Sequence, residues 1–180
     1  MTPETVPHVL TYPRSGMHFF DDTLYKIEKI HFTKSHFLDE VFDKNNNKKR
    51  VIITIARDPI DSISSFLALE NNTAEFLITK MMTEYIFMYA FLYEHADYVI
   101  DFNDLITYPD DVIKKILSLL NIDKAKYHDF AQHDIPKFRE YKPSSKSLPG
   151  YNKEMLNSFN FDLCYYYYNK LLEKKVKVWM

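Results

Sequence analysis

The segment 51–56 (VIITIA) constrains the fold most, because it runs directly into Arg57, Asp58 and Pro59. It is apolar at both alternating sets of positions and rich in β-branched residues, which is typical of a parallel strand buried on both faces. Asp58 is a preferred N-cap residue and Pro59 suits the first helical position, so a helix is predicted over 59–70. A buried strand followed at once by a helix indicates an α/β domain with a mainly parallel sheet.

The rest of the chain repeats this alternation of strands and helices. Further strands are predicted over 6–12, 30–34 and 98–102, and further helices over 17–29, 75–95, 109–120 and 153–174. The helix over 75–95 is apolar almost all round, which makes it a central helix or a candidate homodimer interface. No repeat or linker divides the 180 residues, so we expect a single domain over 1–180.

Composition excludes several classes of protein. With 23 Lys and Arg against 25 Asp and Glu, the net charge of -2 argues against a strongly basic nucleic-acid-binding protein. The lone Cys164 rules out an internal disulfide or a Cys-based zinc cluster, and no metal site is expected. The longest apolar run, 85–93, is far shorter than the roughly 20 residues of a membrane span, and no signal peptide is visible. We expect a soluble, cytoplasmic protein.

Parallel α/β sheets bind ligands at the carboxyl ends of their strands, and the first candidate segment at such a position is 11–19 (TYPRSGMHF). Gly16 permits close approach of the backbone to an anion, Ser15 adds a hydroxyl, and Arg14 adds positive charge. The alternative is an ordinary strand–helix turn with an exposed arginine. GxxxxGK[ST], the P-loop pattern of nucleoside-triphosphate-binding proteins, is absent.

Two more segments follow predicted strands. Arg57 comes directly after the strand over 51–56, and Ser65 lies two helical turns further on, so this pair can bind a phosphate. Alternatively, Arg57 pairs with Asp58 or Asp61. The segment 33–37 (TKSHF) places His36, a residue suited to proton transfer near neutral pH, at another strand end, although a lone histidine is often structural.

Four segments in order resemble the sulfotransferases that use 3′-phosphoadenosine 5′-phosphosulfate (PAPS). TYPRSGMHFF resembles their TYPKSGTTW-type 5′-phosphosulfate loop, and KSHF resembles the KTHLP segment that carries a general base. RDPIDSISS resembles the 3′-phosphate motif, an Arg followed eight residues on by a Ser, and 99–105 (VIDFNDL) with Tyr108-Pro109 resembles the YEDL…P segment. The resemblance covers about residues 6–122 and implies a P-loop-like three-layer fold with a central mainly parallel sheet flanked by helices.

The resemblance also implies roles for individual residues. His36 would be the general base, and Arg14 and Lys34 would stabilise the transition state. Residues that would hold PAPS, or the product adenosine 3′,5′-bisphosphate (PAP), are Arg14, Ser15, Gly16, Met17, His18, Phe19, Arg57, Ser65 and Phe102. Phe19 stands in place of a tryptophan that stacks on adenine and Phe102 in place of a tyrosine, while Met17-His18 replaces two threonines.

The late Arg-Lys-Gly signature of this family is not visible in the chain. Arg139, Lys142 and Lys146 are candidates to replace it on the 3′-phosphate, or they are solvated loop charges. The acceptor would be a small molecule or a saccharide with a hydroxyl or amine. The alternatives to a sulfotransferase are a kinase-like nucleotide phosphotransferase and a non-catalytic nucleotide-binding domain.

Overall fold

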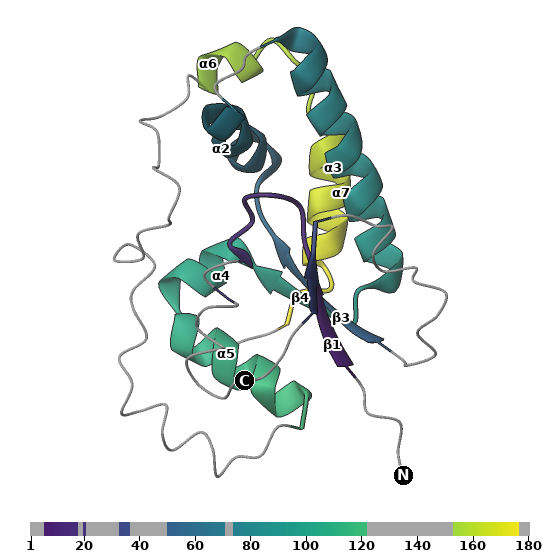
Figure 1. The fold of residues 1–180 in the computed structure, drawn as a ribbon, viewed down its shortest axis with the longest axis vertical. Coiled ribbons are helices and arrows are strands. Elements are labelled where there is room, and N and C mark those ends of the chain that lie inside the picture. Colours follow the sequence, from purple (N-terminus) through teal and green to yellow (C-terminus); the bar gives the residue numbers. More distant parts are fainter. Residues whose placement is uncertain are drawn as a thin grey trace.

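The computed structural model describes residues 6–17, 20, 33–36, 50–70, 74–121 and 153–176. Within them a four-stranded parallel sheet has the order β2-β1-β3-β4. Figure 1 labels β1, β3 and β4 of this sheet. Its strands are β1 (Val6–Leu10), β2 (Thr33–Ser35), β3 (Arg50–Ala56) and β4 (Tyr98–Asp101). The predicted α/β class with a parallel sheet is confirmed.

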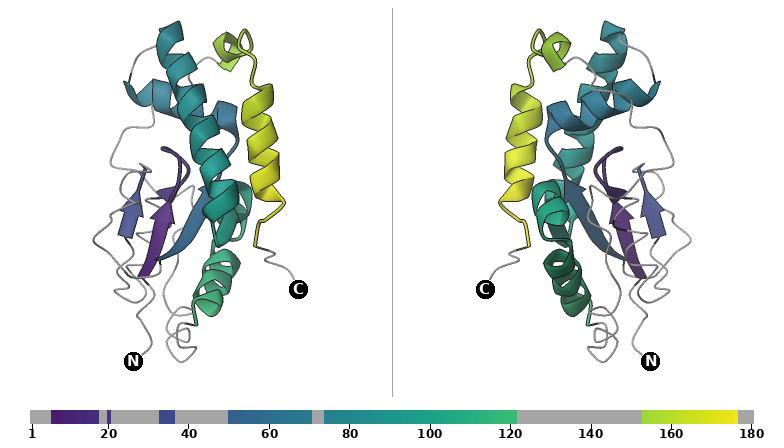
Figure 2. Two further views of the ribbon diagram at one scale, coloured as in Figure 1. Left: turned by 90° about the vertical axis from the view of Figure 1, so that its right-hand side faces the viewer. Right: turned by 90° about the vertical axis from the view of Figure 1, so that its left-hand side faces the viewer.

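The helices lie between and after these strands. They are α2 (Pro59–Glu70), α3 (Glu75–His95), α4 (Phe102–Thr107), α5 (Pro109–Leu119), α6 (Lys153–Leu156) and α7 (Asp162–Leu172). α3 and α7 run side by side over one side of the strands (Figure 2). None of the helices in the described part of the chain is both long and apolar enough to cross a membrane.

Two apolar cores, one on each face of the sheet, bury the strands. Ile52 and Ala56 of β3 join the core made with α2, α3, α6 and α7, whereas Ile53 and Ile55 join the core made with α4 and α5. This division follows from the period of two along a strand, which sends alternate side chains to opposite faces. β3 is therefore covered on both sides, as its apolar sequence predicts.

Three sequence predictions need correction. The strand predicted over 98–102 ends at Asp101, because its carboxylate accepts a hydrogen bond from the amide of Asn103 at 2.9 Å and caps the short helix α4, which begins at Phe102. The helix predicted over 153–174 is two helices, because Ser158 and Asn160 bond locally to the backbone between them. The strand predicted over 6–12 ends at Leu10.

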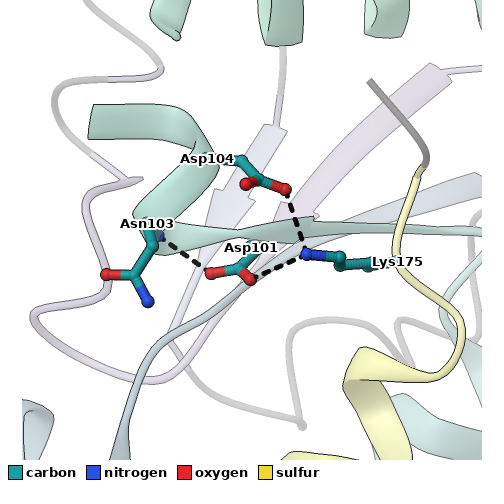
Figure 3. A network of polar contacts seen from close by, with 4 residues as sticks. All are labelled: Asp101, Asn103, Asp104 and Lys175. Atoms are coloured by element: carbon teal, nitrogen blue, oxygen red, sulfur yellow. Dashed lines mark hydrogen bonds and ion pairs between the residues drawn. The ribbon is translucent and has the colours of Figure 1, made fainter. Parts of the chain in front are cut away.

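The chain after α7 is tied back to the end of β4. Lys175 donates to Asp101 at 3.1 Å and to Asp104 at 3.3 Å, so its ammonium lies between the two carboxylates (Figure 3). Lys175 also forms a parallel β-bridge with Val99. These contacts hold α7 beside the carboxyl ends of β3 and β4.

Candidate functional site

The strand order places the switch point of the sheet between the carboxyl ends of β1 and β3, a region that we call the crevice. The chain runs from β1 to β2 on one side and then returns to β3 on the other. After β1, the helical residues Met17 and Phe20 join one core, whereas after β3 the α2 residues Ile63 and Leu67 join the core on the opposite face. Connections that diverge to opposite faces leave a crevice at this switch point, which is where α/β sheets bind ligands.

The loop after β1 forms one wall of this crevice. Arg14 has a φ of 68° and Gly16 a φ of 88°, both in the left-handed region. An added Cβ at Gly16 would lie 3.0 Å from a ring carbon of Phe102, so glycine is required both for the conformation and for the space. In this loop Arg14 holds an uncommon conformation without being glycine, and such positions cluster at functional sites.

Arg57 forms the opposite wall. Its Nη1 donates to the carbonyl oxygen of Arg14, and its guanidinium lies over the ring of Phe102, 4.5 Å from the ring centroid. Its Nε is buried with no hydrogen-bond partner within the described ranges. Burial lowers the pKa of the Arg57 guanidinium; the Asp61 carboxylate opposes this shift, and the charge of Arg14 adds to it. A desolvated cation beside a second cation favours an anionic ligand.

Ser65 is linked to Arg57 through Arg14, which contacts both residues. The Nε of Arg14 donates to the Ser65 hydroxyl at 3.1 Å, across 51 residues of sequence. Ser65 and the buried Ser62 lie on α2, which begins just after Arg57. The structure therefore brings Arg14, Arg57 and Ser65 together at one point.

The main chain of Arg57 is held by two tyrosines that the sequence analysis did not identify. Tyr85 donates to the Arg57 carbonyl oxygen at 2.7 Å and Tyr89 does so at 3.1 Å, while the Arg57 amide donates to the Tyr89 hydroxyl at 2.9 Å. Both tyrosines are fully buried in α3. Their spacing of four residues places them on one helix face, but no sequence pattern links that face to Arg57.

His36 lies on the β2 side of the crevice. Its Nδ1 is 2.8 Å from the carbonyl oxygen of Thr11, at the end of β1. Because a carbonyl oxygen only accepts, Nδ1 carries the hydrogen, and in the neutral ring Nε2 carries the lone pair. Lys34 is exposed on β2, in register with Val9 of β1. The ring is thus held in the tautomer that a general base at Nε2 requires.

A cleft of about 390 Å³ borders Arg57. It is lined by Arg57, Asp58, Ile60, Asp61, Phe102, Asn103, Tyr165 and Tyr168. Asp58 accepts from the amide of Asp61 at 3.0 Å and from the Tyr165 hydroxyl at 3.1 Å, so it caps α2 as predicted. Of the two carboxylates predicted as alternative partners of Arg57, Asp58 makes these two hydrogen bonds, and both Asp61 and, to a smaller extent, Asp58 act on Arg57 through their charge.

Of the remaining predicted site residues, some are buried and some lie outside the described part of the chain. Ser15 is fully buried, and Met17, 4% exposed, packs in the core, so Met17 offers the crevice its main chain rather than its side chain. Phe102 is 8% exposed and carries Arg57 on one face. His18, Phe19, Arg139, Lys142 and Lys146 lie outside the described residues.

Comparison with models of known protein families and with curated proteins finds no match to this chain.

Proposed function

We propose that this protein is a PAPS-dependent sulfotransferase, which transfers a sulfuryl group from PAPS to a hydroxyl or amine of a small-molecule or saccharide acceptor. The observation that carries the proposal is the meeting of Arg14 and Arg57 between β1 and β3, with the Nε of Arg57 buried and without a hydrogen-bond partner in the part of the chain that the structure describes. The four motifs that resemble this family occur in the family's order and supply both arginines.

The crevice suits a ligand with two anionic ends. The loop after β1, with the main chain of Ser15, Gly16 and Met17, would hold the 5′-phosphosulfate. Arg57 and Ser65 would hold the 3′-phosphate, since a guanidinium fork binds phosphate through charge-assisted hydrogen bonds. The fold would then be the P-loop-like arrangement that such enzymes share, with the nucleotide at the switch point of the sheet.

The chemistry would be a displacement at sulfur. The acceptor oxygen or nitrogen forms a bond to sulfur, the bond from sulfur to the bridging phosphate oxygen breaks, and PAP leaves with the electron pair. The acceptor's proton goes to Nε2 of His36, the nitrogen left with the lone pair by the bond from Nδ1 to Thr11. Arg14 and Lys34 would stabilise negative charge on the bridging and sulfuryl oxygens, as cations do in phosphoryl transfer.

Calorimetric titration with PAP, AMP and ATP at fixed moderate salt tests the proposal. PAP differs from AMP by the 3′-phosphate, and charge-assisted bonds to Arg57 should make PAP bind about 10–100-fold more tightly. Arg57→Ala should remove most of that difference. Lys80→Ala is the matched control, because it removes an exposed positive charge from α3 away from the crevice.

The alternative outcomes point to different functions. A preference for ATP over PAP would favour a nucleotide phosphotransferase. Binding of none of the three nucleotides would contradict the proposal, and tight binding of PAP without turnover of PAPS against a panel of hydroxyl and amine acceptors would favour a non-catalytic binding domain.

A further inference from the structure

The main chain of Arg57 lies where the sheet hydrogen bonding stops. The last residue of β3 paired with β4 is Ala56, opposite Asp101, and α2 begins only at Pro59. The amide and carbonyl of Arg57 therefore belong to neither a strand nor a helix. Buried polar groups of the main chain need partners, and a strand end usually finds them in a turn or in water.

Here the partners come from the side chains of one helix. Tyr89 accepts from the Arg57 amide, and both Tyr85 and Tyr89 donate to its carbonyl oxygen. The two rings stack with centroids 3.9 Å apart and an interplanar angle of 18°, which fixes the hydroxyls relative to one another. Three hydrogen bonds from α3 thus hold both polar groups of a single residue.

We propose that Tyr85 and Tyr89 are positioning residues that orient the Arg57 guanidinium for anion binding, by holding the Arg57 main chain at the end of β3. This inference rests on the proposed function in one respect, namely that the anion is the 3′-phosphate of PAP or PAPS. Arg57 is then held at three places. The tyrosines hold its main chain, the Phe102 ring lies against one face of its guanidinium, and its Nη1 donates to the carbonyl oxygen of Arg14. A binding group held in place before the ligand arrives loses less freedom on binding.

The tyrosine hydroxyls are suited to a permanent contact. Burial raises the pKa of Tyr89 to about 12 and raises the pKa of Tyr85 well above its ordinary value. Both hydroxyls therefore keep the hydrogens with which they donate across the neutral range.

Removing the hydroxyls while keeping the rings isolates this role. The variants are Tyr85→Phe, Tyr89→Phe and the double variant. The matched control is Tyr98→Phe, which removes a hydroxyl that donates to the Leu119 carbonyl at 3.3 Å, away from the crevice. The first measurement is the ratio of the affinities for PAP and AMP, because a loss of stability alone does not change the contribution of one phosphate.

We expect the PAP-to-AMP ratio to fall by about five- to tenfold in Tyr89→Phe and further in the double variant, because a misplaced guanidinium loses charge-assisted bonds to the phosphate. AMP affinity should change by less than about twofold, and Tyr98→Phe should keep the wild-type ratio. A folded double variant with the wild-type ratio would overturn the inference. If the double variant fails to fold, the same comparison is made on Tyr89→Phe, which removes two of the three bonds.

A second measurement separates this inference from the proposed function. The Nε–H NMR signal of Arg57, assigned with Arg57→Lys, reports the ordering of the guanidinium without any ligand. The Nε hydrogen should exchange slowly with solvent in the wild type and in Tyr98→Phe. In Tyr89→Phe it should exchange faster, and its chemical shift should move toward that of a solvent-exposed arginine. If the wild type does not distinguish PAP from AMP, the proposed function is wrong, and an unchanged Arg57 signal in Tyr89→Phe would overturn the positioning role independently.

Discussion

Gly16→Ala is the substitution whose effect the structure specifies most closely. The backbone at Gly16 has a φ of 88°, a region in which a Cβ costs about 1–2 kcal/mol. The new Cβ would also lie 3.0 Å and 3.2 Å from two ring carbons of Phe102 and 3.7 Å from a methyl of Leu105. Phe102 is buried and cannot swing into solvent, so overpacking adds about 1–3 kcal/mol.

The two terms together predict a destabilisation of about 2–5 kcal/mol. In urea unfolding with a slope of about 2 kcal/mol/M, the midpoint would fall by about 1–2.5 M. A double-mutant cycle with Phe102→Leu separates the terms, because the smaller side chain relieves the close contact but leaves the backbone cost. In that background Gly16→Ala should cost only about 1–2 kcal/mol.

The same substitution should weaken PAP binding, since the ring that must move also carries the guanidinium of Arg57. A free energy of unfolding within about 0.5 kcal/mol of the wild-type value would refute the argument from the left-handed backbone. An equal cost of Gly16→Ala in both backgrounds would refute the argument from contact with Phe102.

Three more measurements test the role of His36, the buried hydroxyl and thiol groups, and the ion pair of Lys175. His36→Ala should reduce turnover by about 10²–10⁴-fold while PAP affinity changes by less than about threefold, and an equal loss of both would reassign His36 to structure. The free energy of unfolding, measured in urea, should fall by on the order of 2 kcal/mol between pH 8 and pH 10.5. An unchanged urea midpoint over that range would contradict this prediction. The reason is that burial raises the pKa of Cys164 to about 11 and of Tyr89 to about 12, so the unfolded chain loses these protons first and the stability present below about pH 9 is lost above it. Lys175→Met should cost about 1 kcal/mol more than Lys170→Met, because Lys175 pairs with the buried Asp101 and Lys170 with the exposed Glu173; equal costs would show that the buried pair contributes nothing extra.

The elements with strong local signals are those that the sequence predicts well. β3 combines β-branched residues with apolar character on both faces, and α2 begins at the predicted cap, where Asp58 accepts from the amide of Asp61. α3 has the bounds predicted from its apolar content, 75–95, and α5 begins at the predicted Pro109. Each of these signals lies within one element of the sequence and its flanking residues, so no tertiary information is needed to interpret it.

The errors arise where the decision between two local structures is made by a side chain. Asp101 lies inside the strand predicted over 98–102, yet its carboxylate caps α4 and is held by Lys175, 74 residues away. Asn160 lies in a helical pattern, but its side chain accepts from the Asp162 amide at 2.8 Å and starts a new helix instead. Asn and Asp compete in this way because their short polar side chains reach nearby amides.

The candidate site likewise has features that local sequence predicts and features that it does not. The positions of Arg14 and Arg57 after predicted parallel strands are enough to expect them at one edge of the sheet. Their direct contact is not predictable, because it requires β1 and β3 to be neighbours, and strand order is absent from local sequence. The tyrosine partners of Arg57 are further from prediction, since their helix face is indistinguishable from an ordinary apolar face until α3 is packed.

Thr11 connects the two halves of the crevice, and this explains a buried polar residue at the end of β1. Its hydroxyl donates to the Ile55 carbonyl of β3 at 2.8 Å, and its own carbonyl accepts from His36 after β2. One residue thus fixes the position of the proposed base relative to β3, the strand that directly precedes Arg57. Because the side chains of a strand alternate between faces, a shift of one residue in the pairing of β1 with β3 would direct the Thr11 hydroxyl away from Ile55. The register that buries the two cores is therefore the same register that places His36, Arg14 and Arg57 along one edge of the sheet.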